Sequence, residues 1–484
     1  MYKKSSTLAQ AVRLTTLAVV AAPAGALAGG FSLNEQSASA MGTANAGAAA
    51  NPENATTVLF NPAGMSQLSG TNISFGAAVL DIDAEANPGS ISVTRQVPGI
   101  PVQPAKAGGD IADPAVLPNF YLTHEVSNTI DVGFGIHAPY GLAADYEEGF
   151  AGRFFADKTE LTAIAFTPSI SVNNGNGLSM GAGINLIYAE GRLSRYQDVT
   201  GIAYRDAYKQ AIAGGAGAQA AQQVAATTAA GAARYEPYAD IEGDDVGATF
   251  RVGFLYELSD MTQIGLSAQT GTELNLEGDA TISNFPILTA PGQTTTLTEK
   301  VRVPLAIPES ATLGLRHRVN DEFTLLAGAT YAKWSRFEEL DVISQRSTPG
   351  EVSSVSGYPY ISHVTEKWNN TWQFNLGGIW QATPEWALKA GYAWDESPVN
   401  EKYVTARIPS EDRHWLTLGA QWKDVRSGWT VDAAVGTLLF SGDAKVDDRE
   451  YTHDNPTQPA TPARYQATYD LSAWSAALQV SKAF

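Results

Sequence analysis

The sequence contains no cysteine among its 484 residues. A chain without cysteine has no disulfide framework, so packing and backbone pairing must supply its stability. Basic residues are also scarce, with 31 Lys and Arg against 50 Asp and Glu. An acidic chain of this kind does not attract a polyanion, which argues against nucleic acid as a partner.

Long hydrophobic runs are also lacking. Beyond residue 28 no uninterrupted apolar run approaches the length of a membrane helix, about 18 residues. The apolar stretch LTTLAVVAA follows Lys3, Lys4 and Arg13 and leads into AGALA, which is the order of a secretory signal peptide. We expect cleavage after Ala28; the alternative for residues 1–28 is a disordered amphipathic leader. The mature chain would keep 28 basic and 50 acidic residues, a net charge of −22.

The chain has instead many short segments in which apolar and small or polar residues alternate. From Trp386 one face continues through Leu388, Ala390, Tyr392 and Trp394, with aromatic residues at both ends. A two-residue period predicts β-strands, and aromatic ends are typical of outer-membrane strands. Because backbone groups that face lipid must all be paired, a closed barrel is the spanning structure left once helices are excluded. Similar faces begin at Phe323, Trp372, Leu416, Trp429 and Trp474.

Turn signals divide the chain into strands. Short signals lie at residues 127–128, 173–177, 258–261, 319–321, 382–385 and 423–428. Long polar connections lie at about 86–117, 140–160, 197–240, 281–300, 341–365, 397–412 and 446–468. Six short and seven long connections join fourteen strands, and short periplasmic turns with long external loops are the rule for barrels. We therefore predict an all-β fold, a 14-stranded antiparallel outer-membrane β-barrel over residues 71–484.

The chain ends in AWSAALQVSKAF, an alternating strand that stops at Phe484. To remove both sheet edges, this strand must pair with the first one, near residues 71–82. We expect the exposed terminal aromatic strand to be bound by the barrel assembly machinery through strand addition. Outer-membrane lipid and lipopolysaccharide would surround the folded barrel.

Residues 29–70 do not alternate and are small, polar and glycine-rich. A barrel of this size has a lumen that its own side chains do not fill, so we expect this segment to plug it. The alternative is a periplasmic tail, which would leave several apolar side chains exposed without reason: Phe31, Leu33, Val58, Leu59 and Phe60.

Several stretches are similar to a known family. They are GFSLNEQSASAMGTANAG, FNPAGM with Asn61, Pro62 and Ala63, APYGLAADY, AGRFFADKTEL, IPESATLGLRHRVNDEFTLLAGATYAKWSRFEEL, GYAWDESPV and RIPSEDRHWLTLGAQW. They resemble the outer-membrane long-chain fatty acid transporters, the FadL family, whose members begin with a hatch carrying an Asn-Pro-Ala motif. The resemblance extends from residue 30 to Phe484 and departs in the long loops. We call residues 29–70 the hatch.

The resemblance implies passive import of hydrophobic molecules, with long-chain fatty acids as the leading cargo and no cofactor. The ligand would enter an apolar groove among external loops, pass to a lumen pocket, and leave after the hatch rearranges. Residues 197–240 and 281–300 would form the groove, and the Ala-rich stretch within 197–240 has helical propensity. A solvated, mobile loop is the alternative there.

Relatives have a kinked third strand, and here that strand is TIDVGFGIHAPYG. Gly133 and Gly135 are candidate positions for the bend because glycine weakens strand pairing, and Pro139 would end the ladder. Ordinary barrel packing could also require these glycines.

A fatty acid needs apolar walls for its tail and a cation for its carboxylate. The alternation places Arg195 in the lumen, where relatives hold an arginine near the ligand head. The alternative is that Arg195 pairs with an acidic residue of the hatch or the wall. Relatives often have Trp-Lys-Asp in the tenth strand, whereas this chain has Asn369 at the lysine position, and Lys367 could reach the same volume. Phe31 completes the predicted ligand-binding residues.

Other signals point elsewhere. Gly177 to Gly181, around Ser179, fits the hydrolase nucleophile pattern, but that pattern requires a strand-to-helix turn. The six histidines are scattered, so no metal site is predicted. Asp447, Asp448 and Glu450 could bind divalent ions that bridge lipopolysaccharide, or form a solvated loop. Competing functions are uptake of monoaromatic hydrocarbons by the same fold, an outer-membrane lipase and a general porin.

Overall fold

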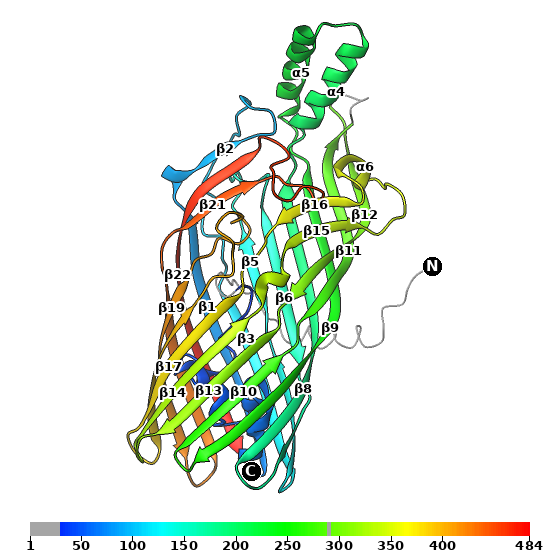
Figure 1. Ribbon diagram of the computed structural model, residues 1–484. Coiled ribbons are helices and arrows are strands. Elements are labelled where there is room, and N and C mark those ends of the chain that lie inside the picture. The colour runs from blue at the N-terminus through cyan, green and yellow to red at the C-terminus, as the bar shows by residue number, and fades with distance from the viewer. Residues whose placement is uncertain (1–29, 288–291) are drawn as a thin grey trace.

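The computed structural model describes residues 30–287 and 292–484. The predicted signal peptide, residues 1–28, lies outside the described residues. Figure 1 shows a tall barrel with its long connections gathered at the upper end and short turns at the lower end. Within the described ranges, no helix combines the length and the hydropathy of a membrane span.

The barrel is one closed antiparallel sheet of 14 strands, as predicted, several of which continue through a break into a second segment. In chain order they are β1 (Thr71–Ala86), β3 (Ala115–Ser127), β4 with β5 (Ile130–His137, Gly141–Asp145), β6 with β7 (Lys158–Phe166, Ser169–Asn173), β8 (Leu178–Tyr196), β9 (Tyr238–Ser259), β10 with β11 (Thr262–Gln269, Thr272–Pro286), β12 with β13 (Thr294–Ile307, Ser310–Arg318), β14 with β15 (Phe323–Ala332, Glu339–Ser344), β16 with β17 (Tyr360–Thr365, Thr371–Gln381), β18 (Trp386–Asp395), β19 (Arg413–Asp424), β20 with β21 (Trp429–Phe440, Ala444–Arg449) and β22 (Arg464–Ala483). The short strand β2 (Ser92–Thr94) pairs with the upper end of β22.

The predicted closure between the last strand and the first is confirmed. β22 pairs with β1 from Ala483 opposite Asn72 to Tyr469 opposite Ala86, and the Phe484 N–H donates to the Thr71 carbonyl. Because the first and last strands pair with each other, the described sheet closes on itself.

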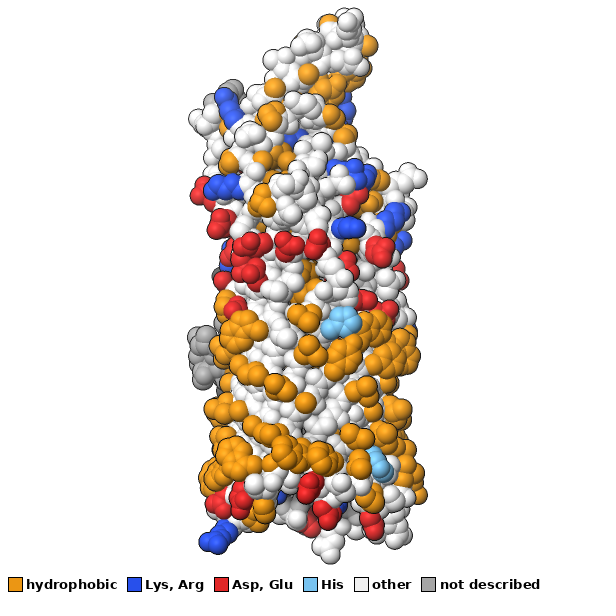
Figure 2. Space-filling view, turned by 90° about the vertical axis from the view of Figure 1, so that its left-hand side faces the viewer, with side chains coloured by type: hydrophobic (Ala, Val, Ile, Leu, Met, Phe, Trp, Pro, Cys, Tyr) orange, Lys and Arg blue, Asp and Glu red, His pale blue; other side chains and the backbone are white. Residues whose placement is uncertain are grey.

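The outer face of the lower barrel is apolar. Along β18, Trp386, Leu388 and Tyr392 are exposed, whereas Ala387 and Lys389 are buried, as the alternation predicts. Figure 2 shows a hydrophobic band around the lower barrel on the face in view, with acidic side chains gathered above and below it. This band is the part of the protein that spans the outer membrane.

The hatch lies inside the lower barrel, where Figure 1 draws it in blue. Its short helices are α2 (Ala38–Met41), η1 (Ala48–Ala50), α3 (Thr57–Phe60) and η2 (Pro62–Gln67). Wall glycines let its backbone approach closely: a Cβ on Gly391 would overlap Thr43, and one on Gly265 would overlap Ala49. The wall is therefore shaped to hold this segment.

A buried charge also joins the hatch to the wall. Lys389 Nζ of β18 lies 2.6 Å from Glu53 Oε2 of the hatch and 3.2 Å from Asp432 Oδ1 of β20, and it donates to the Ser39 carbonyl at 3.0 Å. Removing one partner of such a group leaves an unpaired charge, which costs about 3–5 kcal/mol.

The upper connections carry the remaining helices. η3 (Pro88–Ser90), η4 (Trp334–Arg336) and α6 (Ser353–Ser356) are single turns. α4 (Thr200–Ala213) and α5 (Ala218–Ala232) form a helical hairpin that projects above the barrel, which confirms helices within 197–240.

The predicted long connection at 281–300 is wrong, because most of these residues belong to strands. Strands β11 and β12 continue to Pro286 and from Thr294, with Thr281 opposite Thr298 and Ile282 opposite Leu297. The stretch is polar but rich in threonine, which favours strands, so polarity alone misplaced the boundary.

The packing of the hatch against wall glycines can be tested on neighbouring strands. Gly391→Ala would force a methyl group into Thr43, whereas Gly378 on β17 meets only the Thr324 carbonyl, at 3.9 Å. We expect Gly391→Ala to destabilise the folded barrel by about 1–3 kcal/mol through overpacking. Gly378→Ala should stay within about 0.5 kcal/mol of the native chain. Thermal unfolding in detergent measures both, and equal shifts would contradict this packing.

Candidate functional site

An apolar cavity of about 600 Å³ lies inside the upper barrel. Its walls come from inward side chains of β6, β8, β9, β11 and β12, and from the connections that follow β14 and β18. The apolar lining consists of Phe31, Leu142, Leu161, Leu193, Ile241, Leu276, Val303, Leu305, Phe337, Leu340 and Ile408. A site of this composition suits a hydrophobic ligand.

Phe31 of the hatch anchors an aromatic cluster at one side of this cavity. Its ring packs edge-on against Trp334 and Phe337, with centroids 4.6 and 5.8 Å away, and against Tyr140 at 5.8 Å. Trp368 completes the cluster, 5.9 Å from Phe31. The hatch thus supplies part of the cavity wall.

Arg407 and Glu366 are the buried charged groups that line the apolar cavity. Arg407, in the connection from β18 to β19, donates to Thr159 Oγ1 at 2.9 Å, to the Ser194 carbonyl at 3.0 Å and to the Lys158 carbonyl at 3.3 Å. Burial lowers the pKa of Arg407 to about 10, so it stays protonated at neutral pH. A fixed guanidinium beside an apolar space can bind an anionic head group.

Glu366 lies in the connection between β16 and β17, above the membrane-facing Trp372. Its Oε2 accepts from Trp368 Nε1 at 2.8 Å, while its buried Oε1 has no hydrogen-bond partner among the described residues. Burial raises the pKa of Glu366 to about 8, against a smaller lowering by the Trp368 bond. At neutral pH the carboxyl is therefore protonated and can donate a hydrogen bond to a ligand.

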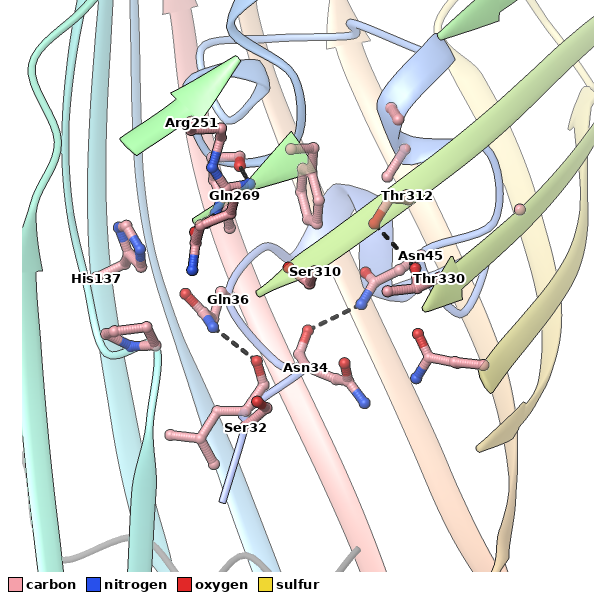
Figure 3. Close-up of a pocket in the computed structure, with 18 of the residues that line it drawn as sticks. Ser32, Asn34, Gln36, Asn45, His137, Arg251, Gln269, Ser310, Thr312 and Thr330 are labelled. Carbon is pink, nitrogen blue, oxygen red and sulfur yellow. Dashed lines mark hydrogen bonds between the residues drawn. The ribbon is translucent and has the colours of Figure 1, made fainter. Parts of the chain in front are cut away.

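A second cavity, of about 1020 Å³, lies on the other side of the hatch N-terminus and is polar. Figure 3 shows hatch side chains such as Asn34 and Asn45 facing barrel-wall residues across it. On the wall, Arg251 donates to Gln269 Oε1 at 2.6 Å. Phe31 lines the apolar cavity, whereas Ser32 and Leu33 line the polar one, so residues 31–33 separate the two.

Residues 31–33 are held by the third barrel strand. The Leu33 N–H donates to the Pro139 carbonyl at 3.1 Å, and the Gly141 N–H donates to the Phe31 carbonyl at 2.9 Å. Ser32 and Tyr140 form an antiparallel bridge between these two bonds. The hatch N-terminus thus takes the place of a neighbouring strand.

The third strand is interrupted between β4 and β5, at Pro139, while a bend at Gly133 and Gly135 stays a prediction. Gly133 and Gly135 stay paired with Thr123 and Tyr121 of β3, and that ladder continues to Ile136. Across residues 138–145 no described backbone hydrogen bond returns to β3 residues 115–119. The two glycines make room, since a Cβ on Gly133 would overlap Met65 of the hatch. The interruption lies at Pro139, which was predicted to end the ladder.

The predicted ligand residues are only partly brought together. Phe31 lines the apolar cavity. Arg195 lies on β8 near enough to Arg407 for the two charges to affect each other, but it does not line the cavity. Lys367 and Asn369 lie in the connection before β17, not on a strand; Asn369 is exposed and neither lines a described cavity.

Sequence reasoning missed Arg407 and Glu366 as candidate ligand residues. Both lie in irregular connections, where no period indicates which way a side chain points. The stretch RIPSEDRHWLTLGAQW, which begins at Arg407, carried the family resemblance, and Glu366 stands two residues before Trp368. The stretches that carry the family resemblance were therefore the available signal for these two residues.

The Asn-Pro-Ala motif fixes the hatch to the wall. Asn61 Nδ2 donates to the Ala49 carbonyl at 2.7 Å and to the Phe254 carbonyl of β9 at 2.9 Å, while its Oδ1 accepts from the Ala63 N–H at 3.1 Å. Pro62 begins η2, where its missing N–H costs nothing.

The other sequence signals fall as follows. Ser179 lies within β8, where its Oγ accepts from Ser66 of the hatch at 2.6 Å, so the strand-to-helix turn of a hydrolase is not found there. Asp447 pairs with Arg464, at 2.6 Å, and with Arg449, so it is not a free external acid.

Asp448 and Glu450 are also occupied. Asp448 is buried and accepts from the Ala406 N–H at 3.0 Å, and Glu450 accepts from Gln96. The expectation that the histidines are scattered is corrected, because the fold brings His363 and His453 together beside Asp341.

Comparison with known proteins gives consistent matches. The family described as "Outer membrane protein transport protein (OMPP1/FadL/TodX)" matches residues 18–484. The "47 kDa outer membrane protein" of Pasteurella multocida (strain Pm70) is 30% identical over 427 residues, 87% of this chain and 89% of that one. The "Long-chain fatty acid transport protein" of Escherichia coli (strain K12) is 26% identical over 435 residues, 88% of this chain and 91% of that one.

A solved structure shares the fold. The crystal structure of a Pseudomonas aeruginosa FadL homologue superposes with a TM-score of 0.76 at 22% sequence identity, covering 94% of this chain and 100% of that one. The agreement in fold extends over the barrel as a whole.

The protonation of Glu366 is directly measurable. Because its raised pKa keeps the carboxyl protonated below about pH 8, raising the pH through that value should remove its protonated-carboxyl infrared band. Glu366→Gln should lack this titration and keep the rest of the difference spectrum. A midpoint near the ordinary value of 4.5 would show that the cavity does not desolvate the group.

Proposed function

The chain belongs to the OMPP1/FadL/TodX family of outer-membrane transport proteins, and we propose that it imports long-chain fatty acids across the outer membrane. The observation that carries the proposal is that Arg407 and Glu366, both buried, line a cavity whose other lining residues are mostly apolar. A fatty acid has the matching chemistry, one anionic head and a long apolar tail. The relatives named for long-chain fatty acid transport add support.

The head group would be bound by two complementary donors. Arg407 supplies a fixed positive charge, and protonated Glu366 supplies a neutral O–H that does not repel a carboxylate. The aliphatic tail would lie along Leu276, Val303 and Leu305. Each buried methylene contributes about 0.8 kcal/mol, so chain length sets most of the affinity and the head group sets orientation.

The route would use the division at residues 31–33. A ligand in the apolar cavity can reach the polar cavity only if this strip of the hatch moves. The third strand offers a lateral exit as well, because β3 residues 115–119 have no ladder partner on that side. Pro118 lies in this stretch, and proline is tolerated where no ladder bond is required.

Uptake of monoaromatic hydrocarbons is the second candidate. It is favoured by the exposed position of Asn369, which leaves the cavity without the head-group lysine that relatives have there. Against it stands the charge of the site, because the buried Arg407 would have no partner on a hydrocarbon.

Arg407 separates these candidates. Replacing it with Met should weaken oleate binding by about 10- to 100-fold, because a charge-assisted hydrogen bond contributes roughly 1.5–3 kcal/mol. Toluene uptake should not change. Arg318→Met, at an exposed turn on the other end of the barrel, is the matched control. Fluorescence displacement measures oleate affinity, and uptake is measured in cells that depend on this chain. Normal toluene uptake without any oleate uptake would instead favour the aromatic cargo.

Movement of residues 31–33 can be blocked by a disulfide, since the native chain has no cysteine. Ser32 and Tyr140 form a bridge pair, so Cys at both positions lies within reach of a bond. Oxidised Ser32→Cys/Tyr140→Cys should bind oleate in detergent but import none in cells. A reductant should restore import, and the single variants control for loss of either side chain. Import that continues under oxidation would contradict passage by hatch movement.

A further inference from the structure

Four potential metal ligands meet on the outer side of the barrel, away from the cavities described above. Glu339 and Asp341 lie on β15, His363 lies on β16, and His453 comes from the connection between β21 and β22. One ligand atom from each residue lies within 4.8 Å of the other three. The two histidines are 90 residues apart in sequence, so only the fold brings them together.

The four side chains surround one point. His363 Nδ1 lies 2.6 Å from Asp341 Oδ1, and His453 Nδ1 lies 2.7 Å from Asp341 Oδ2. Glu339 places its two oxygens 3.9 Å from His363 Nδ1 and 3.6 Å from His453 Nδ1. Ligand atoms around a tetrahedral zinc ion stand about 3.3 Å apart, so shifts of under about 1 Å would form such a shell.

Hydrogen bonding around His363 places a positive bridge, which is either a proton or a metal ion, between His363 and Asp341. The Thr365 hydroxyl donates to the Pro456 carbonyl at 2.9 Å, so towards His363 Nε2, also at 2.9 Å, it can only accept. Nε2 therefore carries the proton, and in a neutral imidazole Nδ1 is then a bare lone pair. That lone pair faces a carboxylate oxygen of Asp341, and two acceptors at this distance need a positive charge between them.

The surroundings already fix the ligands in the way that metal sites do. Thr365 orients His363 through its other ring nitrogen, which is a typical outer-shell contact of metal-binding histidine. His453 is held by stacking on Tyr360, with ring centroids 3.6 Å apart. Asp341 is buried, whereas His453 is partly exposed and gives access from outside.

We propose that Glu339, Asp341, His363 and His453 form a binding site for a divalent transition-metal ion of the zinc type. Two carboxylates balance the two charges of the ion. A set of two imidazoles and two carboxylate oxygens binds Zn²⁺ in preference to Ca²⁺ or Mg²⁺. The ion joins the β15–β16 hairpin to the connection between β21 and β22. Leu340, between the two acidic ligands, lines the apolar cavity, so the ion also fixes that wall. The site does not depend on which hydrophobic cargo the protein carries.

The test is zinc titration of the mature full-length chain in detergent, purified with a tag that contains no histidine. Calorimetry should find one equivalent of Zn²⁺, and Co²⁺ should give the visible absorption bands of a tetrahedral site. His363→Ala/His453→Ala should weaken binding by more than about 100-fold. His124→Ala/His414→Ala, which removes two histidines elsewhere on the barrel, should bind like the native chain. An equal concentration of Ca²⁺ should not compete.

Asp341→Asn provides a second variant of unchanged shape, should the double histidine variant fail to fold. It should weaken zinc binding by at least about 10-fold, because it removes one charge and one ligand oxygen. Absence of stoichiometric binding would overturn the proposal and leave a proton as the bridging cation. Undiminished binding in both variants would overturn it too, by placing the ion elsewhere.

Discussion

The structure depends on one constraint, which is that backbone N–H and C=O groups in the hydrocarbon layer have no water to bond. An unpaired group there costs several kcal/mol, so the sheet must close. The pairing of β22 with β1 over residues 72–86 and 469–483 satisfies this constraint. The period-two alternation and the bond from the Phe484 N–H to the Thr71 carbonyl both belong to that closure.

Closure creates a second problem, because the lumen of a 14-stranded barrel is wider than its side chains. The hatch fills it, and the wall has adapted to the hatch. Glycines at Gly265, Gly314 and Gly391 bring the two backbones together, and Lys389 balances acids from both sides. The inward residues of the lower barrel are therefore selected for fit to one particular segment, while the outward residues need only be apolar.

Much of the fold could be predicted from sequence, because barrel strands carry a strict period. The strand number, the short turns, the closing pair and the α4–α5 helices follow from alternation, turn residues and alanine content. The extent of β11 and β12 could not be predicted in this way, because a threonine-rich stretch is polar and still forms strands. At Gly133 and Gly135 the sequence could not distinguish bending from close approach, because glycine serves both, and the close approach to the hatch is the part that the structure describes.

The site was harder to predict, for a physical reason. Arg407, Glu366 and His453 lie in irregular connections, where direction is set by tertiary contacts and not by a repeat. Arg195 lies on a regular strand, so the alternation could predict which side of the barrel wall it faces. The alternation could not predict whether a cavity lies beside it. Lys367 was placed on a strand that begins only at Thr371.

The same few residues complete the third strand and separate the two cavities, so the barrel wall and the transport path are energetically coupled. Moving residues 31–33 gives up two backbone hydrogen bonds, roughly 1–3 kcal/mol, and exposes Phe31, about 1.5–3 kcal/mol more. At about 0.8 kcal/mol per methylene, about three to eight methylenes that leave water supply a comparable free energy. A long aliphatic chain has enough of them to offset this cost, whereas a single aromatic ring buries less surface. The strength of this contact therefore supports the proposed long-chain cargo.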